Sequence, residues 1–393
     1  MKSAYCLILV LLAFAGLDAR AAQTAPPTQA ETRTLLTSGR FQELDQRYGA
    51  VQQAYGRGEI SDIDLRSAFR TFYDTDAALA EPHLAWVKHS PKSYVAHLAR
   101  GIYFKRLAGE RRGGDFISET SRAQLDGMRE ANRIAAGEFK QSLALERKPL
   151  LTYLHMIDIA SDGGDVPAAR DLLDHAIAID PKTFIVRMKY MGAIRTTWGG
   201  STAMMTAFLK ECRAVGLSAD QLKELEALVL EDEAEVHRYR EGDTDAAISA
   251  YVKAAELAPN HACAPCGPMI KAAGLAAEKK EYKKAVELYS KALAQDAQFV
   301  YALNGRAYNY LQMENGKLAQ ADFLKAAQLG NAYAQSMLGQ MLLEGTSIPA
   351  NRDQAIEWLT KAAAQGDRSA KVLLLVARDK TQVPRLAPGS KLQ

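Results

Sequence analysis

The stretch from Ala285 to Ala297, Ala-Val-Glu-Leu-Tyr-Ser-Lys-Ala-Leu-Ala-Gln-Asp-Ala, decides the fold of this chain. Its first small residue is followed four positions later by an aromatic residue, Tyr289, and three positions after that by Ala292. Residues three and four apart lie on one face of an α-helix, and small side chains on that face let a second helix approach closely. The stretch therefore predicts a helix packed tightly against a partner helix.

The same spacing recurs in three other stretches, two of which reach a Pro five positions further on. They are Ala169/Leu173/Ala176/Pro181, Ala247/Tyr251/Ala254/Pro259 and Ala319/Phe323/Ala326. Ala285 and Ala319 lie 34 residues apart, whereas Ala247 and Ala285 lie 38 apart. The pattern resembles the second helix of the 34-residue tetratricopeptide repeat, in which Pro ends the unit. That resemblance implies a solenoid of helix pairs whose exposed groove binds other molecules.

The repeat pattern changes after Leu329. The sequences Ala-Gln-Ser-Met-Leu-Gly-Gln-Met-Leu-Leu-Glu-Gly and Asp-Gln-Ala-Ile-Glu-Trp-Leu-Thr-Lys-Ala-Ala-Ala-Gln-Gly-Asp lie within residues 331–371. They resemble one full Sel-one-like repeat, a relative of the tetratricopeptide unit. We therefore predict tetratricopeptide repeats over residues 226–330, a Sel-one-like repeat over 331–371 and a frayed tail over 372–393.

Three motifs in the amino-terminal half resemble signatures of a bacterial family, a domain of unknown function often joined to tetratricopeptide repeats. They are Ala99-Arg100-Gly101-Ile102-Tyr103, Arg112-Gly113-Gly114-Asp115-Phe116-Ile117-Ser118-Glu119-Thr120 and Trp198-Gly199-Gly200-Ser201. The resemblance covers residues 35–225, for which we predict a helical domain with tetratricopeptide-like hairpins. It implies no established activity.

Helical periodicity extends almost throughout from Leu35 to residue 371, without a convincing run of alternating β-branched residues. Gly-Asp pairs, such as Gly164-Asp165 and Gly242-Asp243, occur where helix pairs would turn. The predicted fold class is all-α, a solenoid of helical hairpins preceded by an amino-terminal helical domain.

The first residues have the composition of a secretory signal peptide. Met1-Lys2-Ser3 precedes an apolar run from Ala4 to Leu17, and Ala19-Arg20-Ala21 follows. The run is short for a membrane span, and Ala-x-Ala is typical of a cleavage site. We predict a signal peptide over residues 1–21, a flexible leader over 22–34, no membrane span after cleavage, and a periplasmic or otherwise secreted protein.

The charge balance argues against nucleic-acid binding. The chain has 393 residues, with 49 Lys and Arg against 46 Asp and Glu, and a formal net charge of +3. Nucleic-acid binding relies on a strong basic footprint, which this balance does not supply.

The resemblance to tetratricopeptide repeats implies that a ligand meets the first helix of each pair, which for the repeat that contains Ala319 is the helix around residues 301–310. Leu303, Ala307 and Tyr310 fall at its packing positions. This leaves Tyr301, Asn304 and Tyr308 for the concave face, where tyrosines and an amide suit peptide recognition. The alternative is an ordinary solvated helix surface.

A second candidate site lies in the amino-terminal half. If Arg100, Arg112, Asp115 and Trp198 converge, they would form a small-ligand or catalytic pocket. The alternative is structural, with a Gly ending one helix, Ser201 capping the next and Trp198 packing between layers.

Cys263 and Cys266 form a Cys-x-x-Cys pair in a loop between helices. The sequence allows three states for this pair: a disulfide, a metal-binding or redox pair, or two free thiols. The remaining cysteine of the mature chain, Cys212, is expected to be buried on a helix face. We predict no metal site, because a closed zinc site needs four ligands and no second Cys-x-x-Cys is present.

No motif of a nucleophilic, zinc-dependent or phosphate-binding enzyme is found, and no cofactor is predicted. The sequence thus favours an exported, non-enzymatic scaffold that binds a protein or peptide in its groove. The alternatives are a ligand-binding or enzymatic amino-terminal domain delivered by the repeats, or a thiol redox or metal role of the Cys-x-x-Cys pair.

Overall fold

The computed structural model describes residues 26–114, 119–258, 267–345 and 347–378. Helices account for the regular secondary structure of these residues, and none of them lies in a strand. The predicted all-α class is therefore confirmed. The helices form two compact units, which divide between Ser218 and Ala219.

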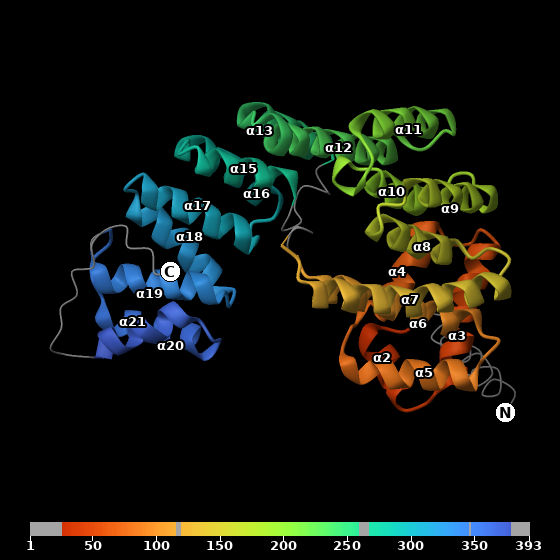
Figure 1. Ribbon diagram of the computed structural model, residues 1–393. Helices are drawn as coiled ribbons and strands as arrows, with labels where there is room; N and C mark the ends of the chain where they lie inside the picture. Colours follow the sequence, from red (N-terminus) through yellow and green to blue (C-terminus); the bar gives the residue numbers. More distant parts are fainter. Residues whose placement is uncertain (1–25, 115–118, 259–266, 346, 379–393) are drawn as a thin grey trace, which may run out of the picture. The chain divides into compact units, whose positions relative to one another are not determined.

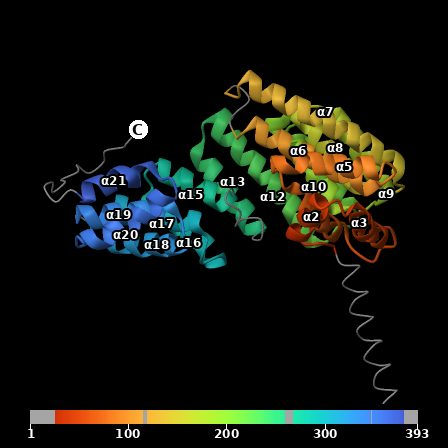
Figure 2. The ribbon, with the colours of Figure 1, turned by 90° about the horizontal axis from the view of Figure 1, so that it is seen from below.

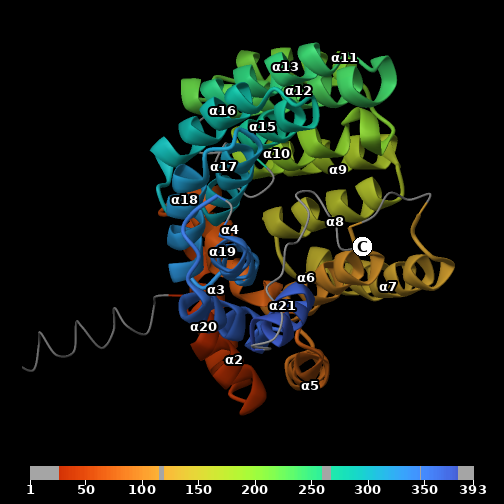
Figure 3. The ribbon, with the colours of Figure 1, turned by 90° about the vertical axis from the view of Figure 1, so that its left-hand side faces the viewer.

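The first unit is a set of antiparallel helices with short connections (Figure 1). Its helices are α2 (Gln29–Thr37), α3 (Phe41–Gly56), α4 (Asp62–Phe69), η1 (Arg70–Tyr73), η2 (Ala77–Leu79), α5 (Ala80–His89), α6 (Tyr94–Arg112), α7 (Arg122–Leu145), α8 (Leu150–Asp162), α9 (Val166–Ile179), α10 (Phe184–Ala193), η3 (Thr196–Trp198) and α11 (Thr202–Ala214). The long helices α6 and α7 run side by side (Figure 2), and α8, α9 and α10 pack against one another (Figure 3).

The close pairing of α6 and α7 depends on a glycine. A Cβ atom added at Gly101 would lie 2.4 Å from the ring of Phe139, which is fully buried. Real Cβ atoms do not approach other atoms so closely, so the missing side chain at Gly101 makes room for the ring. This contact gives a packing role to the glycine of the motif Ala99-Arg100-Gly101.

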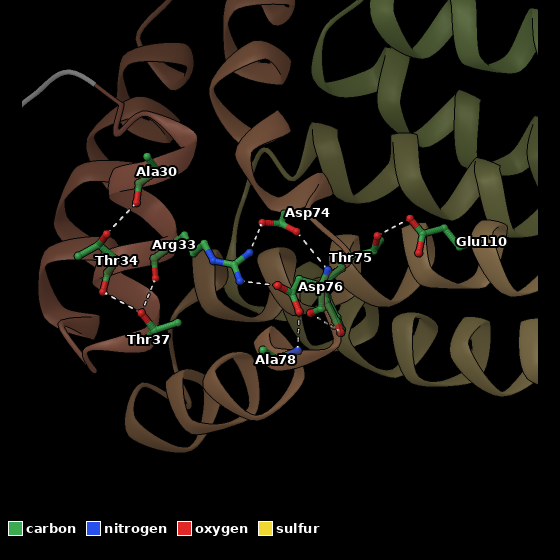
Figure 4. Close-up of polar contacts among 10 residues, drawn as sticks. Ala30, Arg33, Thr34, Thr37, Asp74, Thr75, Asp76, Ala78 and Glu110 are labelled. Carbon is green, nitrogen blue, oxygen red and sulfur yellow. Dashed lines mark hydrogen bonds and ion pairs between the residues drawn. The ribbon is translucent and has the colours of Figure 1, made fainter. Parts of the chain in front are cut away.

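The amino-terminal helix α2 corrects the prediction of a flexible leader over residues 22–34. Thr28 and Glu31 form a capping box at its start, and Leu35 and Leu36 are buried. The guanidinium of Arg33 lies between Asp74 and Asp76, and its Nη1 is 2.9 Å from the carboxylate of Asp74 (Figure 4). The helix is thus anchored to the segment that joins η1 and η2. A Thr-x-x-Glu sequence after two prolines is a helix-start signal that the sequence analysis overlooked.

The second unit consists of successive helical hairpins. Its helices are α12 (Ala219–Val236), the π-helix η4 (His237–Glu241), α13 (Thr244–Leu257), α15 (Pro268–Glu278), α16 (Tyr282–Gln295), α17 (Val300–Gln312), α18 (Gly316–Gln328), α19 (Ala332–Glu344), α20 (Arg352–Ala364) and α21 (Arg368–Arg378). Each helix packs on the next one in the chain, and α15 also contacts α17, as α19 contacts α21 (Figure 1). This is the arrangement of a helical-repeat solenoid.

The small residues at the repeated spacing form the core of these hairpins. Ala247, Ala285 and Ala319 are fully buried, and so are Phe323 and Ala326. One apolar cluster joins buried residues of successive helices, from Ala234 on α12 to Ala355 on α20. The repeat register read from the sequence is therefore the register of the fold.

The turns between paired helices use the left-handed backbone region. Gly164 and Gly242 have φ angles of 68° and 73°, and the Asp after each glycine caps the next helix. Lys280 and Glu314 adopt the same conformation at later hairpin turns, with φ angles of 63° and 57°. These two non-glycine residues are strained locally, because a Cβ disfavours positive φ.

Two boundaries differ from those expected. The predicted division at residues 225 and 226 falls inside α12, because the helix continues across it and packs on α13. The predicted tail from residue 372 begins within α21, where Leu373 and Ala377 are buried. The apolar periodicity of Val372 to Ala377 already indicates that the helix continues beyond residue 371.

Candidate functional site

A groove of about 490 Å³ opens on the second unit. Most of its lining comes from α17, with additions from α15, α16 and the start of α19. The lining residues are Ala277, Tyr289, Val300, Tyr301, Asn304, Gly305, Tyr308, Asn309, Asn331 and Tyr333. Tyr301, Asn304 and Tyr308, predicted from sequence as a concave face, therefore lie together in one groove.

The helical period explains why α17 presents these side chains. Positions 301, 304 and 308 share one face, whereas Leu303 and Ala307 on the opposite face are buried in the core. Tyr301 is 63% exposed and Tyr308 is 45% exposed. Tyr333, which the sequence analysis missed, is 45% exposed and joins them from α19. Its alignment with α17 depends on how two consecutive repeats pack.

The floor of the groove is formed where Gly305 meets Tyr289. A Cβ at Gly305 would lie 2.3 Å from the Tyr289 ring, so only glycine allows this ring to rest on the α17 backbone. The buried phenol of Tyr289 has a raised pKa because burial disfavours its charged form. It is therefore neutral at physiological pH.

Asparagine side chains surround this floor. Asn304 Nδ2 donates to Asn331 Oδ1 over 3.0 Å, and the same oxygen accepts the backbone N–H of Ala334 over 2.9 Å, at the start of α19. Asn309 Nδ2 donates to the carbonyl oxygen of Gly305 over 2.7 Å. Among the described residues, the Oδ1 atoms of Asn304 and Asn309 have no hydrogen-bond partner.

The groove contains no charged side chain among its described lining residues. Partial burial, together with Tyr308, raises the pKa of Tyr333, so this phenol is also neutral. The nearby cation of α17, Arg306, serves a different hollow of about 260 Å³. Its guanidinium binds both carboxylate oxygens of Asp322, at 2.7 and 2.8 Å, and this ion pair raises the pKa of Arg306.

The second predicted pocket is not assembled as expected. Arg100 and Arg112 lie twelve residues apart on α6, which separates them by about 18 Å along the helix axis. Arg100 pairs with Glu138 on α7 and lies over the ring of Phe104 at 5.1 Å. Arg100 therefore belongs to the interface of α6 and α7. Asp115 lies outside the described residues.

Arg112 and Trp198 do meet. The guanidinium carbon of Arg112 lies 5.6 Å from the centre of the Trp198 ring, a cation–π distance. Ser201 caps α11 by accepting the N–H of Met204, and a Cβ at Gly200 would lie 2.0 Å from the carbonyl oxygen of Ile194. The Trp-Gly-Gly-Ser motif therefore has structural roles in closing one helix and starting the next.

A further hollow of about 500 Å³ in the first unit was not anticipated from the sequence. In its lining, the hydroxyl of Tyr55 donates to Asp180 over 2.9 Å, and Asp62 accepts from the hydroxyl of Thr183 and two backbone N–H groups. Burial, with Asp180 beside it, raises the pKa of Tyr55. Both carboxylates are thus occupied in joining helices distant in the sequence.

The cysteine predictions divide by position. Cys263 and Cys266 lie outside the described residues. Cys212 is a buried free thiol whose pKa is raised by burial, which confirms its expected placement on a packed helix face. Within the described ranges, no group of histidine, cysteine and carboxylate side chains could hold a metal ion.

Two family models match parts of this chain. Residues 28–168 match the model of a domain of unknown function, DUF4034, and residues 266–296 and 332–367 match the Sel1 repeat. The chain joins a DUF4034 domain to Sel1 repeats. The first matched Sel1 repeat covers α15 and α16, which the sequence analysis assigned to the tetratricopeptide set. The second covers α19 and α20, so the groove lies on and between the Sel1 repeats.

Solved structures of helical-repeat proteins resemble this chain at low identity. A Sel1 repeat protein from Oxalobacter formigenes is 19% identical, with a TM-score of 0.35 over 65% of this chain and 92% of that one. A signal transduction ATPase with a tetratricopeptide repeat sensor, from Pyrococcus horikoshii, is 14% identical, with a TM-score of 0.42 over 85% of this chain and 51% of that one. No curated protein matches the chain.

Sel1 and tetratricopeptide repeats are protein-interaction modules, so the second unit has the architecture of a protein-interaction scaffold. Among the residues that the structure describes, no helix has both the length and the apolar composition needed to cross a bilayer.

Proposed function

We propose that this protein is an exported, non-enzymatic scaffold that binds a peptide segment of a partner protein in the groove lined by Tyr301, Asn304 and Tyr308. The observation that supports it best is the clustering of three exposed tyrosines, including Tyr333, around one preformed groove. Monomeric proteins rarely leave large apolar side chains together in a hollow unless a ligand covers them. Tyr also gives contact area at a low cost in conformational entropy.

The enzymatic alternative gains no support from the first unit. Arg112 contacts Trp198, but Arg100 pairs with Glu138 elsewhere on α6. The carboxylates of the other hollow, Asp62 and Asp180, accept hydrogen bonds from neighbouring helices and loops. Noncovalent docking in the groove on and between the matched Sel1 repeats remains the function that the described residues favour.

The groove proposal is tested by crosslinking in cells followed by affinity purification and mass spectrometry. Wild type is compared with Tyr301→Ala/Tyr308→Ala. The matched control is Tyr239→Ala/Leu318→Ala, which removes an exposed tyrosine and an exposed leucine, 58% and 45% exposed, outside the groove. We expect a protein partner that is lost only in the groove variant. Equal recovery from all three proteins, or no partner at all, would refute docking in this groove.

Export is part of the proposal and rests on the signal-peptide pattern of residues 1–21. Cell fractionation with amino-terminal sequencing tests it. We expect protein outside the cytoplasm that begins near Ala22, and retention of the protein after an Asp replaces Leu11 in the apolar run. Full-length protein confined to the cytoplasm would contradict it.

A further inference from the structure

We infer that the occupant of the groove is an uncharged, extended stretch of polypeptide whose backbone N–H groups donate to Asn304 and Asn309. This inference rests on the proposed function, because it names the chemistry of the segment that binds in the same groove. It excludes a chain terminus and a charged motif as the recognised feature.

Two asparagines of the groove lining have side-chain oxygens without a hydrogen-bond donor among the described residues. The side chain of Asn309 is 1% exposed and lines the groove, yet its Oδ1 has no partner in the described part of the chain, and neither has Oδ1 of Asn304. A buried amide oxygen without a donor is unfavourable, so a bound donor recovers free energy there. Ligand N–H groups provide such donors, whereas a carboxylate provides only acceptors.

The hydrogen bonds of the Nδ2 groups fix the orientation of both side-chain amides. Asn309 must point Nδ2 at the Gly305 carbonyl, because the reversed amide would bring two acceptors together. Asn304 must point Nδ2 at Asn331 Oδ1, because that oxygen already accepts from Ala334. The free positions at Asn304 and Asn309 are therefore acceptors, and the ligand is a donor.

Charge also restricts which ligand the groove can bind. The described lining of the groove has no Lys, Arg, His, Asp or Glu, and burial raises the pKa of Tyr289 and Tyr333. A charged ligand group entering it would lose water without gaining an opposite charge. Arg306, the cation on α17, is directed at Asp322 and Ser290 in another hollow. An uncharged segment therefore fits best.

The spacing of two groove tyrosines matches an extended ligand. Tyr301 and Tyr308 lie seven residues apart on α17, about 10.5 Å along the helix axis. Extended polypeptide advances about 3.3 Å per residue, so about three ligand residues span the two rings. Asn304 lies between them in the sequence of α17, where a backbone amide of the middle residue would pass.

The test uses purified protein without residues 1–21 and three matched libraries of hexapeptides. The first contains uncharged, acetylated and amidated peptides; the second has one Asp or Lys in each peptide; the third has free carboxyl ends. Affinity selection and fluorescence anisotropy give the relative Kd values. We expect the first library to supply the tightest peptides, and a charge or free carboxylate to weaken them at least about tenfold.

A double-mutant cycle then tests the hydrogen bonds. N-methylation of the central ligand amides should weaken binding at least about tenfold to wild type but only slightly to Asn304→Leu or Asn309→Leu. Gln340→Leu, on α19 outside the groove lining, should retain the full effect of N-methylation. Thermal melts followed by circular dichroism check that each variant folds. If Asn309→Leu does not fold, the cycle is carried out with Asn304→Leu alone.

The outcomes separate this inference from the proposed function. Selection of acidic, basic or free-carboxyl peptides, or equal N-methylation losses in wild type and both Asn variants, would overturn the inference while groove docking stands. Failure of all libraries would also overturn it if crosslinking still yields a partner that requires Tyr301 and Tyr308. Absence of any such partner would refute the proposed function itself.

Discussion

At the scale of single residues, Gly305 is the position where the groove and the core meet. We expect Gly305→Ala to lower the free energy of unfolding by about 1–3 kcal/mol, because the new Cβ collides with the Tyr289 ring. Gly274→Ala on α15, where a Cβ would meet nothing within 4 Å, is the matched control. It should be neutral or stabilising by up to about 1 kcal/mol. Denaturant unfolding measures both, and equal effects would contradict this packing account.

The buried side chain of His83 should make the stability of the protein depend on pH. It is 1% exposed, and burial, followed by the charge of Arg100, lowers its pKa to about 3. An unfolded histidine titrates near pH 6.5, so the unfolded chain binds a proton that the folded chain rejects. The contribution of His83 to stability is therefore constant above pH 6.5, and below it His83 lowers the free energy of unfolding by about 1.4 kcal/mol per pH unit. His83→Phe should be increasingly favoured over wild type between pH 6.5 and 5, as followed by urea unfolding.

His97 makes the free energy of unfolding depend on pH in the opposite direction to His83. Its Nδ1 lies 2.6 Å from a carboxylate oxygen of Glu138 and its Nε2 lies 3.1 Å from the carbonyl oxygen of Pro91. The hydrogen bond to Glu138 raises the pKa of His97, although Arg100 opposes this. Its stabilisation is thus complete below pH 6.5 and is lost as pH rises through the folded pKa. His97→Gln should cost more stability at pH 5.5 than at pH 9. A constant cost would show that the charge contributes nothing.

At the scale of the helix, the register of small residues is the decisive feature. Ala285 on α16 is fully buried, so Ala285→Asp places an unpaired charge in the core. We expect a loss of several kcal/mol and a markedly lower melting temperature. Lys283→Asp, which adds the same side chain at an exposed position of α16, is the control and should melt close to wild type. An unchanged melt of Ala285→Asp would show that the register is wrong.

The helix pairs could be predicted because their signal is local. Spacing among Ala285, Tyr289 and Ala292 defines one buried face without knowledge of its partner. The ends of the chain were predicted less well. Residues 29–34 and 372–378 were assigned to a leader and a tail, yet α2 is held by Arg33 and α21 by burial of Leu373. Both helices nevertheless carry local signals, the Thr28 and Glu31 capping box and the apolar spacing of Val372 to Ala377, which the predicted boundaries did not take into account.

At the scale of the whole molecule, the division at Ser218 and Ala219 predicts two independently folding parts. We expect fragments 26–218 and 219–393 each to be soluble, helical by circular dichroism and cooperative on heating, because each unit has its own buried residues. A cut at 225, inside α12, is the control and should give a less stable second fragment. Fragments that fold only when mixed would contradict this division.

The sequence by itself determined the all-α class, the hairpin register and the exposed face of α17, because each follows from the period of one helix. It also named Tyr301, Asn304 and Tyr308 as neighbours, since they lie on that face. Only the tertiary structure decided that Tyr333 and Asn331 complete the groove and that Arg100 and Arg112 lie apart. The reason is physical. Contacts between helices depend on how the repeats pack, and the periodicity of one helix does not determine where the neighbouring helix lies.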